Sequence, residues 1–244
     1  MSADAHSGGA IILQARAGST RLPAKVLRPF GDVTLLEHIV ARLRATELPV
    51  WVATSTLHGD DPVAELAGQA GADVFRGDEA DVLGRFAACV EAMPHRPDHI
   101  VRICADRPFV SPDVILDHVA AWVEAGRPAI VSSSIEPSFP IGLEVEVVAT
   151  DALITAAAEA RDPYEREHVT PYLYRHPDVF AQVSLTCPYG NYAHVRAVVD
   201  TFADYDALVR VNERLERVRA DHGFEELLTL ATVDLGTFPS EAAV

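Results

Sequence analysis

Short apolar segments alternate with amphipathic segments over the first half of the chain, and this alternation leaves few folds open. Apolar strands are expected near 10–13, 50–55, 72–75, 99–105 and 128–131. Between them, apolar residues recur at helical spacing over 34–46, over 61–70, from 82 to a stop at Pro94, and over 111–124. Continuously apolar strands that are joined through helices by short connections are typical of a parallel sheet covered by helices on both faces. The first half therefore predicts a doubly wound α/β fold.

The pattern changes in the second half. Residues 142–148 alternate polar and apolar side chains, which predicts a half-exposed antiparallel strand. A helix near 151–161, the segment 164–174, strands at 180–185 and 194–199, and two final helices are expected after it. Without an internal repeat or a low-complexity linker, the whole of 1–244 is interpreted as a single domain. Within it, 1–9 are expected to be disordered and 236–244 to form a tail.

Composition narrows the partners and the compartment. The chain is 49% hydrophobic and 23% charged, as in ordinary globular proteins, and its formal net charge of −16 disfavours nucleic acid as a partner. The three cysteines form no CxxC pair, which favours buried thiols in a reducing compartment. Neither a signal pattern nor an apolar stretch of about 20 residues is seen, so a soluble cytoplasmic protein without a membrane partner is expected.

A cationic loop follows the first strand directly. The apolar run 10–13 leads into a loop that holds Arg16, Gly18, Ser19, Arg21 and Lys25. Cations, hydroxyls and backbone N–H groups just past the end of a strand are typical of an anion site. The loop matches neither the Walker pattern nor Gly-x-Gly-x-x-Gly, which disfavours P-loop ATPases and dinucleotide oxidoreductases. A solvated loop with salt bridges would explain the charges but not their position after a buried strand.

Two aspartates end apolar strands in the same local pattern. Asp106 follows VRICA and Asp200 follows VRAVV. Because ligands in open α/β sheets bind beyond the carboxyl ends of the strands, we expect both near the cationic loop, as we do Thr54–Ser55 and Arg76–Gly77. One or two carboxylates typically hold magnesium on a nucleotide. The alternative is structural, with Asp106 starting the turn into a proline and Asp200 capping the next helix.

The segment 14–27, QARAGSTRLPAKVL, resembles the signature of the SpsF-type cytidylyltransferases, which are relatives of the 3-deoxy-manno-octulosonate and acylneuraminate cytidylyltransferases. The resemblance continues, in the order of that family, through ATS at 53–55, RGDEADVLGRF at 76–86, VRICADRP at 101–108, PIGLEVE at 140–146, EREHVTPY at 165–172 and VVDT at 198–201. It implies a Rossmann-like nucleotide-diphospho-sugar transferase fold with an antiparallel extension in the second half.

The resemblance also implies roles for particular residues. It implies that Ala15, Arg16, Gly18, Ser19, Arg21 and Lys25 bind the triphosphate, that Thr54, Ser55, Arg76 and Asp81 lie near the base and ribose, that Asp106 and Asp200 hold Mg²⁺, and that Gly142, Glu144, Arg166, Glu167 and His168 face the acceptor. Arg16, Lys25 and the two metal-binding aspartates would be the catalytic residues.

Two positions depart from the family pattern. Ala24 stands where glycine is usual, so the loop is expected not to need a positive φ there. Arg107 stands where a small residue or cysteine is common, which adds a charge facing an anionic acceptor. Around His168, the alternative is the polar face of a helix whose Val169 and Tyr172 pack inward. Similarly, Glu144 and Glu146 share one face of an alternating strand, so one of them could be a solvated side chain.

The sequence and the resemblance together predict a Mg²⁺-dependent cytidylyltransferase. It would transfer CMP from CTP to a small anionic acceptor (an acidic sugar, phosphosugar or phosphonate), release pyrophosphate and act as a homodimer. A guanylyl- or other nucleotidyltransferase on the same fold is one alternative. A second is a sugar-nucleotide glycosyltransferase, a class in which an Asp-x-Asp metal motif would be expected. The third is a non-catalytic nucleotide-binding subunit, which the presence of both aspartates disfavours.

Overall fold

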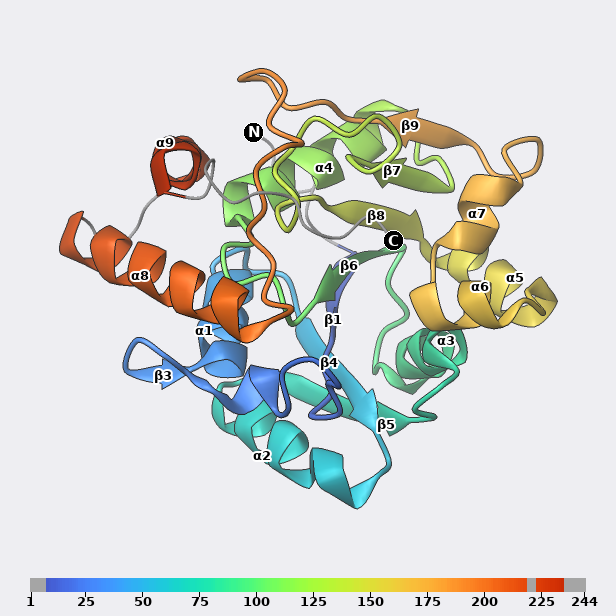
Figure 1. Ribbon diagram of the computed structural model, residues 1–244. Helices are drawn as coiled ribbons and strands as arrows, with labels where there is room; N and C mark the ends of the chain where they lie inside the picture. The colour runs from blue at the N-terminus through green and yellow to red at the C-terminus, as the bar shows by residue number, and fades with distance from the viewer. Residues whose placement is uncertain (1–7, 219–222, 235–244) are drawn as a thin grey trace.

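A seven-stranded mixed sheet forms the centre of the molecule (Figure 1). The computed structural model describes residues 8–218 and 223–234. The strand order is β5-β4-β1-β6-β8-β7-β9. These strands are β1 Gly9–Gln14, β4 Val50–Ser55, β5 Asp73–Gly77, β6 His99–Cys104, β7 Ile130–Ser132, β8 Glu146–Ala149 and β9 Gln182–Ser184. A separate two-stranded hairpin pairs β2 Pro29–Phe30 with β3 Val33–Thr34.

Successive strands are added to the sheet first on one side of β1 and then on the other. From β1 the chain moves outward through β4 to β5, and it then returns to place β6 on the other side of β1. All of these pairings are parallel, whereas β8 is antiparallel to both of its neighbours, β6 and β7. The predicted α/β fold with a mostly parallel sheet and an antiparallel element in the second half is thus confirmed. The switch point between β1 and β6 is where a ligand site is expected.

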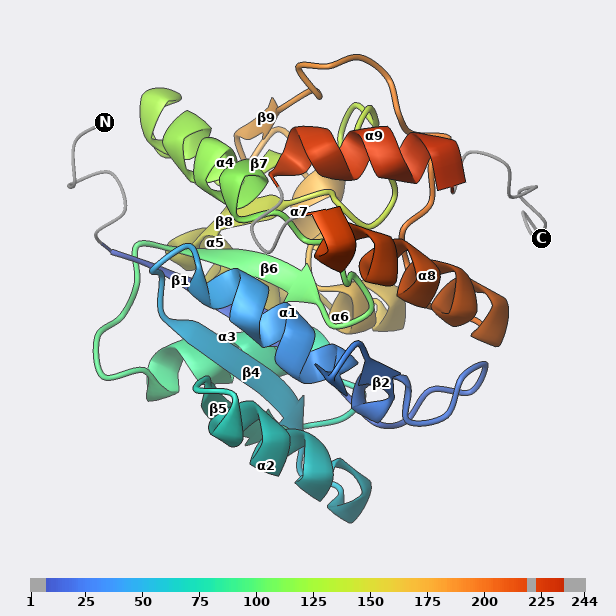
Figure 2. The ribbon, with the colours of Figure 1, turned by 90° about the vertical axis from the view of Figure 1, so that its left-hand side faces the viewer.

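Helices cover both faces of the sheet, as predicted. One face packs against α1 Leu35–Arg44, α2 Asp61–Gln69, α4 Pro112–Glu124, α8 Phe202–Val218 and α9 Phe224–Asp234, which Figure 2 shows in front of the strands. The other face packs against α3 Val82–Ala92, α5 Thr150–Glu159 and α7 Pro171–Arg175, and α6 Pro163–His168 lies beside α3. Two short 3-10 turns, η2 Lys25–Leu27 and η3 His58–Asp60, complete the elements. Both faces of the central strands are therefore apolar, which is why they read as continuous hydrophobic runs.

Two of the expected strands differ in the structure. The alternating stretch 142–148 forms a strand only from Glu146, and β8 is buried on both faces rather than half-exposed, because it lies between β6 and β7 with helices over the sheet. Residues 194–199 form no strand and make one isolated bridge, Ile141 to Arg196. This segment runs across the end of the sheet instead, and Val199 N donates to the Asp106 carbonyl at 2.8 Å.

The ends of the chain and the cysteines complete the comparison with the sequence. Of the stretch 1–9 that was expected to be disordered, Gly8 and Gly9 are described and Gly9 belongs to β1. Residues 1–7 and the predicted tail at 236–244 lie outside the described residues. Cys89, Cys104 and Cys187 are free thiols. Within the described ranges, no helix has the length and apolar character needed to cross a membrane.

A buried histidine in α4 predicts a pH dependence of stability. His118 is fully buried, its Nδ1 lies 2.7 Å from the Val114 carbonyl, and burial lowers its pKa from 6.5 to about 4. Between these pH values the unfolded chain binds a proton that the folded chain does not, so stability falls as pH drops from 6.5 to 4. The total loss is on the order of 3 kcal/mol. Urea unfolding at pH 7 and pH 5 should show that His118→Phe weakens this dependence, whereas replacement of the exposed His95 by Gln leaves it unchanged.

Candidate active site

The loop after β1 borders a cavity of about 330 Å³ at the switch point. Two contacts fix its backbone: Ala17 N donates to Asp60 Oδ1 at 2.6 Å, and Ala24 N donates to the Ala17 carbonyl at 3.1 Å. The cavity is lined by Gln14, Ala15, Arg16, Gly18, Ser19, Thr20, Arg21, Lys25, Val26, Arg102, Cys104, Ala105, Asp106, Glu167, His168 and Asp200. The loop and both strand-end aspartates therefore meet at one site, as the sequence predicted.

Ala24 corrects one expectation about this loop. Its φ of 53° and ψ of 34° place it in the left-handed region, immediately before η2. The inference that alanine excludes a positive φ here is therefore wrong. The turn that carries Lys25 into the cavity imposes this conformation, although a Cβ disfavours it by about 1–2 kcal/mol.

Replacement of Ala24 by glycine should stabilise the protein, because glycine adopts this conformation without the Cβ penalty. We expect a gain of about 0.5–1 kcal/mol, since the added entropy of glycine in the unfolded chain offsets part of the relief. Thermal and urea unfolding measure it. Ala160→Gly at a buried position with a negative φ is the control and should destabilise. An unchanged or lower stability of Ala24→Gly would contradict the prediction.

Lys25 joins the two aspartates. Its Nζ lies 3.0 Å from Asp106 Oδ2, 2.9 Å from the Val199 carbonyl oxygen and 3.5 Å from Asp200 Oδ1. Asp200 is also paired with Arg21 at 3.0 Å and with Arg196. Lys25 is the single lysine of the chain, and every other Lys-or-Arg position holds arginine. A compact ammonium that orders two carboxylates before any ligand binds is thus a distinctive feature of this site.

The two carboxylates suit a hard divalent cation. Asp106 and Asp200 both reach the same ammonium, so their oxygens lie close enough to share one ion. Within the described ranges, no three His, Cys, Asp or Glu side chains cluster as a metal site. A bound ion would therefore depend on ligand oxygens and water for its remaining positions, which is the usual arrangement for Mg²⁺ on a nucleotide.

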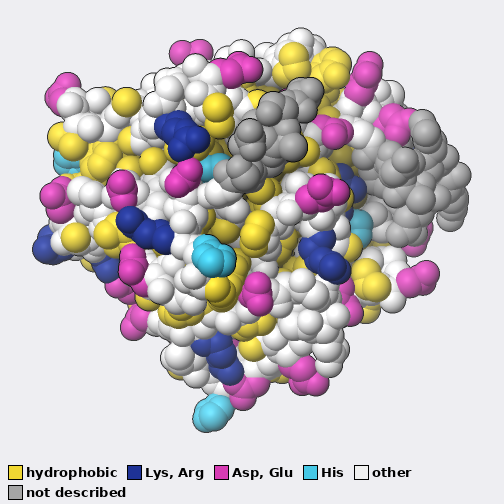
Figure 3. Space-filling model, turned by 180° about the vertical axis from the view of Figure 1, so that it is seen from behind, with side chains coloured by type: hydrophobic (Ala, Val, Ile, Leu, Met, Phe, Trp, Pro, Cys, Tyr) yellow, Lys and Arg dark blue, Asp and Glu magenta, His cyan; other side chains and the backbone are white. Residues whose placement is uncertain are grey.

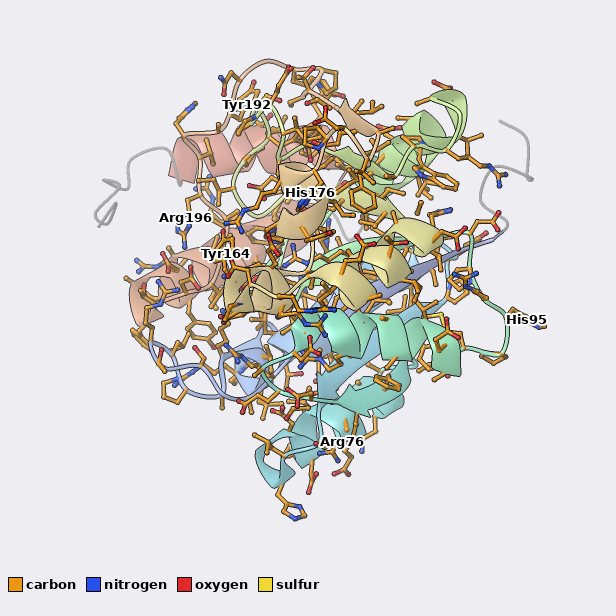
Figure 4. All side chains as sticks on the ribbon, turned by 90° about the vertical axis from the view of Figure 1, so that its right-hand side faces the viewer. Arg76, His95, Tyr164, His176, Tyr192 and Arg196 are labelled. Carbon is orange, nitrogen blue, oxygen red and sulfur yellow. The ribbon has the colours of Figure 1, made fainter. Side chains whose placement is uncertain are left out.

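A second cavity of about 600 Å³ adjoins the first and is rich in arginine. The two share Arg102, Cys104, Asp106 and His168 as wall residues. The other lining residues are Arg107, Ile141, Tyr164, Thr170, Pro171, Tyr174, Arg175, Arg196 and Val198. Figure 4 shows Tyr164 and Arg196 on the same side of the molecule. On the face opposite to Figure 1, by contrast, basic side chains are scattered among acidic ones (Figure 3).

Comparison with known proteins decides the family. The family model described as cytidylyltransferase matches residues 10–227. The chain belongs to the cytidylyltransferase family. It is 34% identical to the spore coat polysaccharide biosynthesis protein SpsF of Bacillus subtilis, over 90% of this chain and 92% of that protein. It is also 34% identical to an uncharacterized protein of Methanocaldococcus jannaschii, over 86% of this chain and 85% of that protein.

Solved structures agree with this assignment. A cytidylyltransferase from Leptospira borgpetersenii superimposes with a TM-score of 0.86 and 25% identity, covering 98% of this chain and all of that one. A CMP:2-keto-3-deoxy-manno-octonic acid synthetase complexed with CTP superimposes with a TM-score of 0.62 over 87% of this chain and all of that one. At 15% identity, this second similarity shows the shared fold alone. The protein is thus a nucleotidyltransferase-type enzyme of the cytidylyltransferase family.

The residues predicted for the base and ribose lie outside the lining of the first cavity. Thr54 and Ser55 are fully buried. Arg76 binds Asp61 at 2.7 Å and donates to the Ser55 carbonyl at 2.8 Å, and in Figure 4 it lies far from Tyr164 and Arg196. Asp81 caps α3 by accepting from Gly84 N at 2.9 Å.

The predicted acceptor residues separate into two groups. Arg107 and His168 line the second cavity and Glu167 lines the first. Glu144 supports Arg107, whose Nη1 donates to the Glu144 carbonyl at 2.7 Å, and it also accepts from Gly142 N at 2.6 Å. Gly142 has a φ of 105°, and a Cβ there would lie 2.6 Å from the Ala197 carbonyl oxygen, so only glycine fits.

Arg166 and the alternative for its helix can also be placed. Arg166 turns away from the cavities to bind Asp81 and the Ala157 carbonyl. Val169 is fully buried, as the structural alternative expected, yet the exposed Glu167 and His168 still line cavity walls. The segment therefore packs into the core through one residue and lines the cavity walls with its neighbours.

Three charged residues of low exposure near the site have no role in the sequence prediction. Glu146 was considered there only as a side chain that could be solvated, and the structure buries it. Asp60 accepts from Ala17 N and from Ser55 Oγ, so it ties the cationic loop to the end of β4. Arg102 and Glu146 form an ion pair of 2.6 Å between β6 and β8. The available signal was a charge inside an apolar run, as in IVRIC at 100–104. Charges in a strand that is buried on both faces need a partner, and the partner could not be read from sequence.

The chain does contain one Asp-x-Asp triplet, Asp204-Tyr205-Asp206, but it serves α8. Asp204 accepts from Thr201 N at 2.7 Å and from Asp200 N at 3.1 Å, which caps the helix. Asp206 pairs with Arg210 one turn later. The triplet therefore has a structural explanation, and the glycosyltransferase alternative gains no support from it.

Proposed function

We propose that this protein transfers CMP from CTP to a small anionic acceptor and releases pyrophosphate, with Mg²⁺ as cofactor. One observation carries the proposal: a cavity with a cationic loop and two aspartates opens into a second cavity lined by arginines. The acceptor oxygen would attack the α-phosphorus in line, and the bond to pyrophosphate would break. The names of the 3-deoxy-manno-octulosonate cytidylyltransferase relatives, at 25–30% identity, support cytidine and an acidic acceptor.

The cationic loop would hold the triphosphate. Arg16 and Arg21 are 41% and 65% exposed and so can turn toward a ligand, while Lys25 is preorganised. The backbone of Ala15 and Gly18 and the hydroxyl of Ser19 would add hydrogen bonds. Fixed donors at the point where negative charge develops are among the largest contributions to such catalysis.

Asp106 and Asp200 would hold Mg²⁺. When bound, the ion neutralises charge on the phosphates during transfer. Because Lys25 contacts both aspartates, its ammonium would share their oxygens with the ion and would face the phosphates from its present position. The two carboxylates can thus bind both the Lys25 ammonium and a metal ion.

The second cavity would bind the acceptor. Four arginines in its wall (Arg102, Arg107, Arg175 and Arg196) favour an anionic group, and Arg107 is held in place by Glu144. We retain His168, which lines both cavities, and its neighbour Glu167, which lines the first cavity, as acceptor-facing residues. Arg166 acts there only through α6, since its guanidinium binds Asp81.

The residues that recognise the base and the oligomeric state are proposed from the resemblance to the family. Thr54, Ser55, Arg76 and Asp81 remain the proposed residues around the base and ribose. A homodimer and a cytoplasmic location are likewise proposed by analogy, and sedimentation of the purified protein tests the first.

A screen of the four nucleoside triphosphates against acidic sugars, phosphosugars and phosphonates, read by pyrophosphate release, tests this function. We expect CTP to be used with an anionic acceptor and Mg²⁺, and chelation to abolish turnover. Preference for GTP or UTP would instead indicate another nucleotidyltransferase. Binding of CTP without pyrophosphate release under any acceptor would favour a non-catalytic subunit.

A further inference from the structure

Arg102 is a charged residue in the middle of an apolar central strand, and it lines both cavities. It lies in register with Ile12 of β1 and Glu146 of β8. Its neighbours on this face of the sheet, such as Ile100 and Val148, belong to the hydrophobic core. Its side chain is only 12% exposed, and what remains exposed lies where the two cavities meet.

Glu146 fixes the guanidinium from the neighbouring strand. Arg102 Nη1 donates to Glu146 Oε2 at 2.6 Å, while the other carboxylate oxygen accepts from Thr170 Oγ1 at 2.8 Å and from the Tyr174 hydroxyl at 2.5 Å. Burial by itself raises the pKa of Glu146, but the Arg102 charge and these hydrogen bonds lower it below its usual value. Glu146 is therefore an ionised carboxylate whose two oxygens are both engaged.

This ion pair is a poor device for stability alone. Removing two charges from water is costly, and apolar side chains of similar volume often stabilise a core equally well or better. The core around the pair is apolar and could accommodate such residues. The presence of the ion pair is explained if the Arg102 guanidinium binds a ligand at the cavity wall.

The Nη groups of Arg102 retain donors for a ligand. A guanidinium has five N–H groups, and among the residues that the structure describes Arg102 uses one of them in a hydrogen bond, to Glu146. Its Nε is buried without a partner, so it is the Nη groups that can reach the cavities. Of the four residues common to both cavity walls, Arg102 is the permanent cation and Asp106 is the acid.

We propose that Arg102 contacts the α-phosphoryl group during transfer and that Glu146 is the positioning residue that aims it. The inference rests on the proposed function. In that reaction the acceptor oxygen forms a bond to the α-phosphorus while the bond to the bridging oxygen of pyrophosphate breaks, and that electron pair leaves with pyrophosphate. An ionised phosphate or phosphonate oxygen has no proton to lose, and the proton of a hydroxyl acceptor goes to the departing pyrophosphate. Nucleotide and acceptor must meet at the junction of the two cavities, so a cation there faces the non-bridging oxygens of the reacting phosphorus.

The double variant Arg102→Gln/Glu146→Gln tests the catalytic role. It removes both charges together, so no buried ion is left without a partner, and the amide introduced by Glu146→Gln retains an oxygen that can accept from Tyr174 and Thr170. We expect kcat to fall by about 100-fold, with unchanged affinity for a non-hydrolysable CTP analogue in calorimetry. The matched control is Arg96→Gln/Asp151→Asn, an exposed pair away from both cavities, which should keep wild-type kcat.

Two single variants keep the proposal open to refutation if the double variant folds poorly. Arg102→Lys preserves the charge pair but loses the planar fork, so kcat should fall less than in the double variant. Glu146→Gln leaves Arg102 charged but loosely aimed, so kcat should fall with little change in the KM for CTP. Wild-type kcat in folded Arg102→Lys, or an equal loss of CTP binding and turnover in the double variant, would overturn the proposal.

A readout without an acceptor separates this inference from the proposed function. The ³¹P resonance of bound CMP should shift between wild type and Arg102→Lys, while the cytidine ring protons keep their positions. An unchanged ³¹P resonance overturns the role of Arg102 even if turnover is seen. If wild type releases no pyrophosphate with any acceptor but the resonance shifts, the phosphate contact stands and the proposed transfer reaction fails.

Discussion

Replacement of Lys25 by alanine is expected to lower kcat/KM for CTP by about 10²- to 10³-fold, the loss typical of removing one preorganised donor from a developing negative charge. The ammonium is 15% exposed and is already held by Asp106, Asp200 and the Val199 carbonyl. It is therefore ordered before the nucleotide arrives, and little entropy is lost when it binds phosphate. Initial rates of pyrophosphate release measure the effect.

Lys25→Ala should also have an opposite effect on metal binding. Because the ammonium lies between the two carboxylates, it competes with a divalent cation for their oxygens. The variant should therefore bind Mn²⁺ more tightly than wild type in the absence of CTP, as measured by electron paramagnetic resonance. Weaker Mn²⁺ binding by the variant would contradict this arrangement.

The single lysine permits a direct test in the native chain. Reductive ¹³C-methylation labels one lysine side chain, Lys25, besides the N-terminal amine. The Lys25 methyl resonance should move on addition of CTP and should move again when Mg²⁺ is added. Exposed Arg127→Lys, which lies away from both cavities, supplies a second methylated lysine as control, and its resonance should not respond.

The spacing of apolar residues was sufficient to predict the strands and helices whose burial is set by their own residues. Strands buried on both faces and helices with one buried face leave periodic traces, as in α1, where the predicted stripe from Leu35 to Leu43 is fully buried. The pattern failed where the backbone pairs at a distance. Residues 194–199 are as apolar as a strand, yet they cross the sheet end because Val199 bonds to the Asp106 carbonyl.

The same division applies to the site. The cationic loop could be predicted because its residues are contiguous, and the switch-point rule brought Asp106 and Asp200 to it. Asp60 and Glu146 could not be predicted, because their roles depend on contacts with Ala17 and Arg102 that are 43 and 44 residues away. The surrounding residues do not show which partner such a carboxylate has. Ala24 shows a different error. The presence of alanine was taken to exclude a positive φ, yet the turn imposes one.

Replacement of Asp106 by asparagine is expected to lower kcat by at least about 100-fold and to raise the Mg²⁺ concentration needed for half-maximal rate. Among the residues that the structure describes, Asp106 forms one ion pair, with Lys25, whereas Asp200 forms three, with Lys25, Arg21 and Arg196. The metal must therefore displace more positive charge at Asp200. Asp200→Asn should lower kcat as well, but it should also raise the KM for CTP, because it releases Arg21 from its position in the loop.

Direct ligation can be separated from a merely electrostatic role of Asp106. In Asp106→Cys, the softer Cd²⁺ should restore more activity than Mg²⁺, because thiolate prefers softer ions. Asp151→Asn at an exposed position serves as the control and should keep both the rate and the Mg²⁺ dependence of wild type. A carboxylate that acted only by orienting Lys25 would give neither the shifted Mg²⁺ requirement in Asp106→Asn nor the Cd²⁺ preference in Asp106→Cys. If both effects were absent, we would conclude that Asp106 orients Lys25 and does not bind the metal.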